Sequence, residues 1–75
     1  MKVKTPNLTH WNYRVIECKL GGYEIREVYY HEDKPLASTL KGIEPYGETI
    51  EELKKDLELI AKAFDKPILK ESDFD

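Results

Sequence analysis

The sequence predicts an α+β fold, in which a three-stranded antiparallel meander is followed by one C-terminal helix packed on the sheet. Two stretches rich in aromatic and β-branched residues, 11–20 and 23–30, flank a Gly-Gly pair, which is typical of a β-hairpin. A shorter alternating stretch follows at 36–40. Apolar residues then recur at helical spacing over 50–64, which indicates an amphipathic helix.

Length and composition allow one small domain. The chain has 75 residues, of which 40% are hydrophobic and 36% are charged, a balance typical of folded rather than disordered chains. A domain this short buries only about 60% of the surface of its unfolded chain, so we expect modest stability. We expect a flexible N-terminal arm at 1–10, a single β-β-β-α domain at 11–69 and a mobile acidic tail at 70–75.

Charge and hydropathy argue against several classes of partner. The formal net charge is −3, and no stretch has the clustered Lys and Arg that neutralise phosphates, so nucleic acid is an unlikely partner. No segment approaches the roughly 20 apolar residues that cross a bilayer, and no signal peptide is evident. The single cysteine, Cys18, fits a reducing compartment. We expect a cytoplasmic protein with no membrane contact, no metal and no cofactor.

The Gly-Gly pair is expected to form a two-residue hairpin turn, because glycine supplies the positive φ angles that tight turns need. That turn places Lys19 opposite Glu24. It also places Glu17 opposite Arg26, and both oppositely charged pairs would help to fix the register. One hairpin face would then hold Trp11, Tyr13, Val15, Val28 and Tyr30, and the other would hold Ile16, Cys18, Leu20, Tyr23, Ile25 and Tyr29.

Both faces of this hairpin are therefore partly apolar. We expect the helix to cover one face, because a small sheet without cover is barely stable in water, and the other face to be available to a partner. Which face forms the core stays open on the sequence. The neighbours Tyr29 and Tyr30 point to opposite sides, so one should be buried and the other free.

The rest of the chain supplies the third strand and the helix. A polar turn at 31–35 precedes the strand at 36–40, and a loop covers 42–47. Thr49 and Glu52 form a capping-box pattern, which predicts that the helix begins at residue 50. Pro67 ends it, and the apolar pair that follows is expected to tuck against the domain. The predicted inner face of the helix consists of Ile50, Leu53, Leu57, Ile60, Ala61 and Phe64, whereas Leu59 points nearly opposite.

The sequence offers little catalytic chemistry. The run from His31 to Asp33 has no second cluster of ligands to complete a metal site. Cys18 lies within an apolar strand pattern, without the cationic neighbour or helix N-terminus that activates a thiol. No phosphate-binding glycine motif is present. An enzyme is therefore the least expected class.

The candidate site is a partner-binding surface. Arg14 and Glu27 would lie on one hairpin face, either as a surface ion pair of little energetic value or as the polar centre of an interface. The alternative is that the exposed apolar residues are the ordinary scatter of a folded surface. The candidate partner-binding residues are Trp11, Tyr13, Arg14, Glu27, Tyr29, Tyr30 and Leu59.

Two resemblances accompany these patterns. The segments WNYRVIE, GGYEIREVYYHED and EPYGETIEELKKDLELIAKAFDKPIL resemble a group of small bacterial proteins from Trp11 to Leu69, and this likeness implies no particular activity. The order of strands followed by GETIEELKKDLELIAKAF is also faintly similar to HicB-type antitoxins, which have a partial RNase-H-like fold. The chain lacks the P-x-x-P/G-C element and the DNA-binding domain of those proteins.

Three functions follow as hypotheses. The first is a non-enzymatic interaction module that self-associates or binds a protein partner through an uncovered sheet face. The second is a HicB-like antitoxin or a phage-type inhibitor that neutralises one specific protein. The third is a small enzyme, which would require a cleft with perturbed titratable groups.

Overall fold

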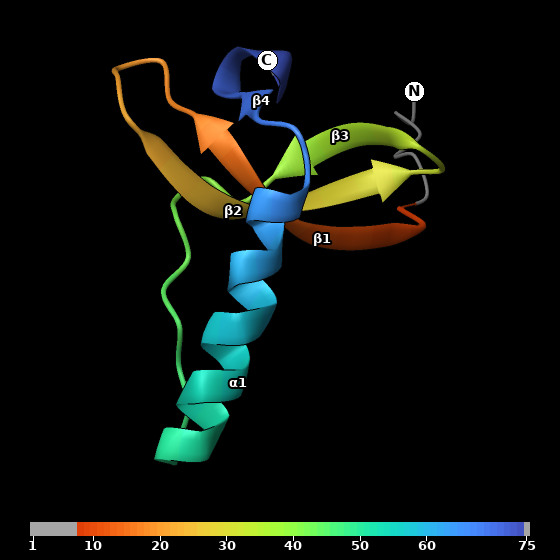
Figure 1. Cartoon of the computed structure of the whole chain (residues 1–75). Coiled ribbons are helices and arrows are strands. Elements are labelled where there is room, and N and C mark those ends of the chain that lie inside the picture. The colour runs from red at the N-terminus through yellow and green to blue at the C-terminus, as the bar shows by residue number, and fades with distance from the viewer. Residues whose placement is uncertain (1–7, 75) are drawn as a thin grey trace, which may run out of the picture.

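The computed structural model describes residues 8–74 and has the predicted α+β architecture (Figure 1). Most of the predicted N-terminal arm lies outside these residues, and His10 already belongs to the first strand. The chain forms, in order, β1 (His10–Glu17), β2 (Tyr23–His31), β3 (Lys34–Ser38), α1 (Ile50–Ala61), the 3-10 helix η1 (Lys62–Asp65), β4 (Leu69–Lys70) and the 3-10 helix η2 (Glu71–Phe74).

The sheet has the strand order β3-β2-β1-β4. The first three strands form the predicted antiparallel meander, whereas β4 runs parallel to β1 and pairs Leu69 with Ile16. This fourth strand was not predicted, because two residues are too short to show an alternating pattern. Its formation is favoured by Pro67, which keeps the preceding chain from continuing the helix, and by the free edge of β1, whose backbone groups accept a partner.

The predicted register of the β1–β2 hairpin is wrong. The connecting loop comprises residues 18–22 rather than the glycine pair alone, and it closes through a Cys18 N–H bond to the Gly22 carbonyl at 3.0 Å. Both glycines do have positive φ, +103° at Gly21 and +81° at Gly22. Glu17 lies opposite Tyr23 rather than Arg26. The shift is three residues, and an odd shift moves one strand's side chains to the other face.

The observed register supports a packed apolar cluster. It places Ile16, Val28 and Tyr30 on one face, where they form a packed cluster with exposed fractions of 5% or less. Burying an Ile or Val side chain contributes about 1.5–3 kcal/mol. The charge pairs of the predicted register contribute only a few tenths of a kcal/mol each. Burial therefore outweighs the charge pattern on which the prediction relied.

Different segments cover the two faces of the sheet. Leu69 and Phe74 from the C-terminal segment pack on the cluster of Ile16, Val28 and Tyr30, which we call the tail-side face. The opposite, helix-side face contains Val15 and meets the end of the helical segment, where Ala63 is fully buried. Both faces are thus partly covered, and the helix packs on the sheet through its last turns.

The predicted mobile tail is held against the sheet over residues 70–74. Glu71 accepts hydrogen bonds from the Lys19 backbone N–H at 2.8 Å and from Arg26 Nη2 at 2.7 Å. The buried Arg26 also pairs with Glu24 through its Nε atom. The Lys19 N–H and the Arg26 guanidinium together hold the pKa of Glu71 below its ordinary value. The sequence prediction missed this attachment because its partners lie more than 40 residues away.

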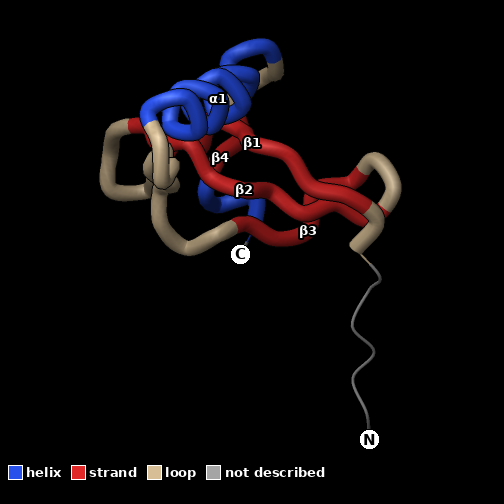
Figure 2. The backbone as a smooth tube through the Cα atoms, turned by 90° about the horizontal axis from the view of Figure 1, so that it is seen from below, coloured by secondary structure: helices blue, strands red, loops and turns tan. Residues whose placement is uncertain are grey.

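The helix projects away from the sheet (Figures 1 and 2). The molecule measures 48 × 27 × 21 Å along its principal axes. Among the described residues, only the loop at 39–49 runs beside the projecting part, and it is attached by the Tyr46 N–H to Asp56 Oδ2 bond of 2.8 Å. A Cβ atom at Gly47 would clash with the Leu53 backbone nitrogen, so this close approach of loop and helix requires glycine.

The predicted cap of the helix is present. Thr49 has extended backbone angles, and its hydroxyl accepts the Glu52 N–H at 3.1 Å. The Glu52 carboxylate accepts the N–H of Glu48, one residue before the cap, at 3.1 Å. These bonds satisfy N–H groups that have no partner within the helix itself.

We predict that Thr49→Ala lowers the free energy of unfolding by about 1 kcal/mol, because the first turn loses its side-chain acceptor. Denaturant unfolding measures the change. Thr49→Ser keeps the hydroxyl and is the matched control; an equal loss in both variants would show that the cap bond is not the cause.

We predict that Glu71→Gln removes an acid-sensitive part of the stability. Because the pKa of Glu71 is lower in the folded than in the unfolded chain, its stabilisation is complete above the unfolded value of about 4.5 and is lost as pH falls through the folded value. Unfolding curves from pH 7 to pH 3 should therefore show a wild-type advantage that shrinks below about pH 4.5. The exposed Glu51→Gln is the control and should not reproduce this pattern.

Candidate functional site

The main candidate site is an apolar groove between β1 and the end of α1, which we call the aromatic groove. Trp11 and Tyr13 reach the same side because they are two residues apart on one strand. Their rings meet edge to face, with centroids 5.2 Å apart and planes at 85°. Leu59 from the helix completes the apolar wall. The groove encloses about 390 Å³ and is lined by Trp11, Asn12, Tyr13, Leu59, Lys62 and Lys66.

The apolar residues of the groove are available to a partner. Trp11 is 51% exposed and Leu59 is 48% exposed. Figure 2 shows that α1 covers only one end of the sheet and leaves the part of β1 and β2 nearer the β2–β3 turn open. The groove therefore lies at the boundary between the covered and the open part of the helix-side face.

The helix-side face continues from the groove onto β2. Tyr29 lies opposite Trp11, and Glu27 lies opposite Tyr13. The Tyr29 hydroxyl donates to Glu27 Oε1 at 2.7 Å, and this bond, with partial burial, raises the pKa of Tyr29. Burial and the carboxylates of Asp56 and Glu27 raise the pKa of Tyr13. Both phenols therefore stay protonated at neutral pH and act as hydrogen-bonding groups rather than bases.

The structure brings together five of the seven predicted partner-binding residues on the helix-side face. These five are Trp11, Tyr13, Glu27, Tyr29 and Leu59.

The remaining two, Arg14 and Tyr30, lie on the tail-side face with exposed fractions of 8% and 5%. They belong to the interior of the domain. The wrong register accounts for this correction, because it had placed Tyr30 beside Trp11 and Arg14 beside Glu27. In the structure Arg14 lies opposite Arg26.

Arg14 has a structural role in attaching the C-terminal segment. Its Nη1 donates to the Tyr30 hydroxyl at 2.7 Å, and its Nη2 donates to the Pro67 carbonyl at 2.6 Å. Among the described residues Arg14 forms no ion pair, and its Nε and the neighbouring Asn12 Oδ1 are buried without a hydrogen-bond partner. The His10 ring stacks on Tyr30 at 4.6 Å. Arg14 thus joins β1, β2 and the chain after the helix.

Two lysines of the groove were missed by the sequence interpretation. Lys62 follows Leu59 by three residues, which is the spacing of one helix face, so this periodicity would have identified it once Leu59 was assigned to the site. Lys66 lies just beyond η1 in extended backbone, and helical spacing does not predict its position. Neither forms an ion pair within the described part of the chain, so both contribute positive charge to the rim of the groove.

A second apolar hollow lies on the other flank of η1. It encloses about 340 Å³ and is lined by Val15, Tyr23, Phe64, Lys66 and Ile68. Tyr23, Phe64 and Ile68 are each more than half exposed. The helical segment therefore meets the sheet between two apolar depressions, one on each side.

A third hollow, of about 430 Å³, is a weaker candidate. It lies by the tail-side face, between the hairpin loop and η2. The buried cation in its wall, Arg26, is already paired with Glu24 and Glu71. A ligand would have to displace these carboxylates to reach the guanidinium.

The Cys18 thiol is not activated as a nucleophile. Burial, together with the carboxylate of Glu24, raises the pKa of the Cys18 thiol, which lowers its reactivity. Within residues 8–74, no three His, Cys, Asp or Glu side chains are grouped so that they could hold a metal ion. No helix in the same range is long and apolar enough to span a membrane.

Comparison of the chain with models of protein families, with curated proteins and with solved structures gives no match. The resemblances found in the sequence thus gain no support from these comparisons. The function has to be argued from the surface that the chain presents.

We predict that the adjacent Tyr30→Phe and Tyr29→Phe substitutions have unequal costs. Tyr30→Phe removes an acceptor from the buried Arg14 and should lower the free energy of unfolding by about 1–3 kcal/mol. Tyr29→Phe removes a partly exposed bond and should cost less than about 1 kcal/mol. Thermal or urea unfolding of the two variants checks this difference, and equal costs would contradict the assignment of the two faces.

Proposed function

We propose that the protein is a non-enzymatic interaction module that binds another protein through the aromatic groove. One observation carries this proposal. Trp11 and Tyr13 lie beside Leu59 at the open end of the helix-side face, and the side chains of Trp11 and Leu59 are about half exposed. Trp and Tyr are the residues most enriched at interfaces, because they bring large, stiff contact area with a polar tip.

The distribution of apolar residues supports binding over ordinary surface scatter. In the described residues, twelve large hydrophobic side chains are exposed, against six buried hydrophobic residues. Single exposed hydrophobic residues are common on folded proteins. Here, however, many of them gather along α1 and beside its junction with the sheet, and clustering is what distinguishes an interaction surface.

The rim of the groove indicates the chemistry of the partner. Lys62 and Lys66 stand beside an apolar floor, and neither is neutralised by a described carboxylate. A partner segment could place apolar or aromatic side chains on this floor. An Asp or Glu next to them would then pair with the lysines of the rim. The protein itself carries net negative charge, so this basic rim is a local feature that favours an acidic segment.

The raised pKa values of Tyr13 and Cys18 also support a binding role over catalysis. A catalytic base or nucleophile at neutral pH needs a pKa near 7 or a neighbouring base. The Tyr13 phenol of the groove instead remains a hydrogen-bond donor, which suits recognition of a partner's polar backbone.

A more specific form of this proposal is a neutraliser of one protein, such as a HicB-like antitoxin. What favours it is the order of elements, in which the sheet is followed by a helix opening with Thr49 and Glu52 as cap residues. In that case the captured partner should lose its own activity when bound.

We predict that Trp11→Ala and Leu59→Glu each abolish binding of the partner. The first removes the largest contact surface of the groove, and the second places a charge in its apolar wall. The measurement is capture by tagged protein from cells of the source organism, with bound proteins identified by mass spectrometry and their affinity then measured with purified components.

Leu20→Glu is the matched control, because Leu20 is fully exposed at the hairpin loop, away from the groove. It should bind as the wild type does, and unfolding curves should show all three variants folded. If Trp11→Ala and Leu59→Glu bind as tightly as Leu20→Glu, the groove is not the binding site.

A further inference from the structure

The helical segment at 50–65 carries an apolar stripe that the described residues leave largely exposed. Ile50 is 85% exposed, Leu57 is 53% exposed and Phe64 is 71% exposed. They are seven residues apart, with Phe64 in the 3-10 helix η1 that continues α1. Leu53 and Ile60 fall between them at the positions that complete a heptad pattern; Leu53 is 40% exposed, whereas Ile60 is buried at the junction with the sheet. Such a pattern is typical of a helix that pairs with another helix.

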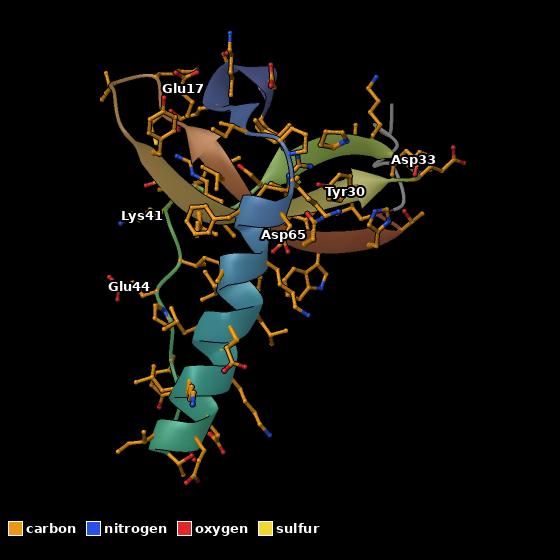
Figure 3. All side chains as sticks on the ribbon, viewed as in Figure 1. Glu17, Tyr30, Asp33, Lys41, Glu44 and Asp65 are labelled. Carbon is orange, nitrogen blue, oxygen red and sulfur yellow. The ribbon has the colours of Figure 1, made fainter. Side chains whose placement is uncertain are left out.

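The helix also has little support from its own sheet. Of its apolar residues, only Ile60 and Ala63 are buried, both near the junction with β1. Figure 3 shows the side chains of the rest of α1 radiating outward, with Asp65 at the junction. An isolated helix of this length is marginal in water, because most helical stability in proteins comes from packing of the apolar face.

We propose that a second copy of the chain covers this stripe, with the two helices antiparallel and the two-fold axis beside Leu57. This inference names one partner for the interaction module proposed above, but places it on a different face of α1 from the aromatic groove. The stripe is suited to such symmetry. A two-fold axis at Leu57 sets the Leu57 residues against each other and sets Ile50 of each copy against Phe64 of the other.

The end of the stripe provides a place for the opposing helix. Beside Phe64 lies the hollow of about 340 Å³, whose wall includes Tyr23 and Ile68. In the antiparallel arrangement Ile50, the most exposed residue of the stripe, arrives at the mouth of this hollow. Apolar groups are thus present at both ends of the pairing as well as at its centre.

The charges favour the antiparallel direction. Residues 42–53 contain four glutamates and no Lys or Arg, so the N-terminal end of the helix and the loop before it are acidic. Antiparallel pairing keeps the acidic end of one copy away from the acidic end of the other. A parallel arrangement would set the glutamates of the two copies side by side and would align the helix dipoles unfavourably.

The available area fits a dimer interface. Six large apolar side chains along the stripe and hollow are exposed by 40–85%: Tyr23, Ile50, Leu53, Leu57, Phe64 and Ile68. With about 100 Å² for an aliphatic and about 200 Å² for an aromatic side chain, they present on the order of 500 Å² per copy. Since homodimer interfaces are about 65% apolar, this corresponds to about 800 Å² per copy, the standard size of a specific interface.

The first test is sedimentation of the full chain over a concentration series. The wild type should form dimers, and Leu57→Glu, which places charge at the two-fold axis, should raise the dimer dissociation constant at least about 30-fold. Leu59→Glu is the matched control: it makes the same change two residues away on the opposite face of the helix and should dimerise as the wild type does. Circular dichroism confirms that both variants are folded.

The second test determines the orientation by disulfide formation in a Cys18→Ala background. Ile50→Cys mixed with Phe64→Cys should give crosslinked heterodimers under mild oxidation, whereas each variant alone should crosslink poorly. Crosslinking of Ile50→Cys with itself would indicate parallel helices and overturn the proposed arrangement.

A wild type that stays monomeric at high concentration, or a dimer that Leu57→Glu leaves intact, overturns the inference. Neither result bears on the proposed binding of a partner in the aromatic groove. If the groove is the binding site, Leu59→Glu abolishes capture of the partner and Leu57→Glu does not. Conversely, loss of dimers in Leu57→Glu with no protein captured by the groove would support the dimer and contradict the groove.

Discussion

The hydrogen-bond register between β1 and β2 is the constraint on which the rest of the structure depends. The five-residue loop at 18–22 sets Ile16 and Val28 on the same face as Tyr30. That face becomes a core for the C-terminal segment. The same register leaves Trp11 and Tyr13 on the other face with Tyr29, where only the end of the helix meets the sheet. A slip of one residue would exchange these faces.

Attachment of the C-terminal segment decides where the helix lies. After η1 the chain adds β4 to the edge of β1, Arg14 binds the Pro67 carbonyl, and Glu71 binds the buried Arg26. These contacts hold the chain just beyond the helix against the sheet. The helix is thereby fixed at its C-terminal end and projects at its N-terminal end, where only the loop at 39–49 accompanies it (Figure 1).

A helix held in this way presents two apolar surfaces on opposite sides. Leu57 belongs to the stripe and Leu59 to the aromatic groove, although only two residues separate them, because each residue turns the helix by about 100°. The two proposals are therefore compatible in space. A dimer formed through the stripe would carry two aromatic grooves, and two linked sites bind a repeated or paired partner more tightly than one site does.

The sequence by itself determined the kinds of element and their order, because periodicity and capping are local properties. The three strands, the Thr49 cap and the helix starting at residue 50 were all predicted. The predicted inner face of the helix was wrong, because Ile50 and Leu57 are exposed and Leu59 instead lines the groove beside β1. Trp11 and Tyr13 share a face because of strand alternation alone, so the centre of the candidate site was predictable too.

Only the tertiary structure decided the pairing of those elements. The charge pattern predicted a tight glycine turn, but the energy of burying Ile16 and Val28 exceeds that of a few exposed charge pairs, and the register followed burial. This shift moved Arg14 and Tyr30 from the predicted surface into the interior. The strand at Leu69–Lys70 and the bond between Glu71 and Arg26 join residues far apart in the chain. Such contacts leave no local pattern, because they depend on which edges and charges the folded sheet brings within reach.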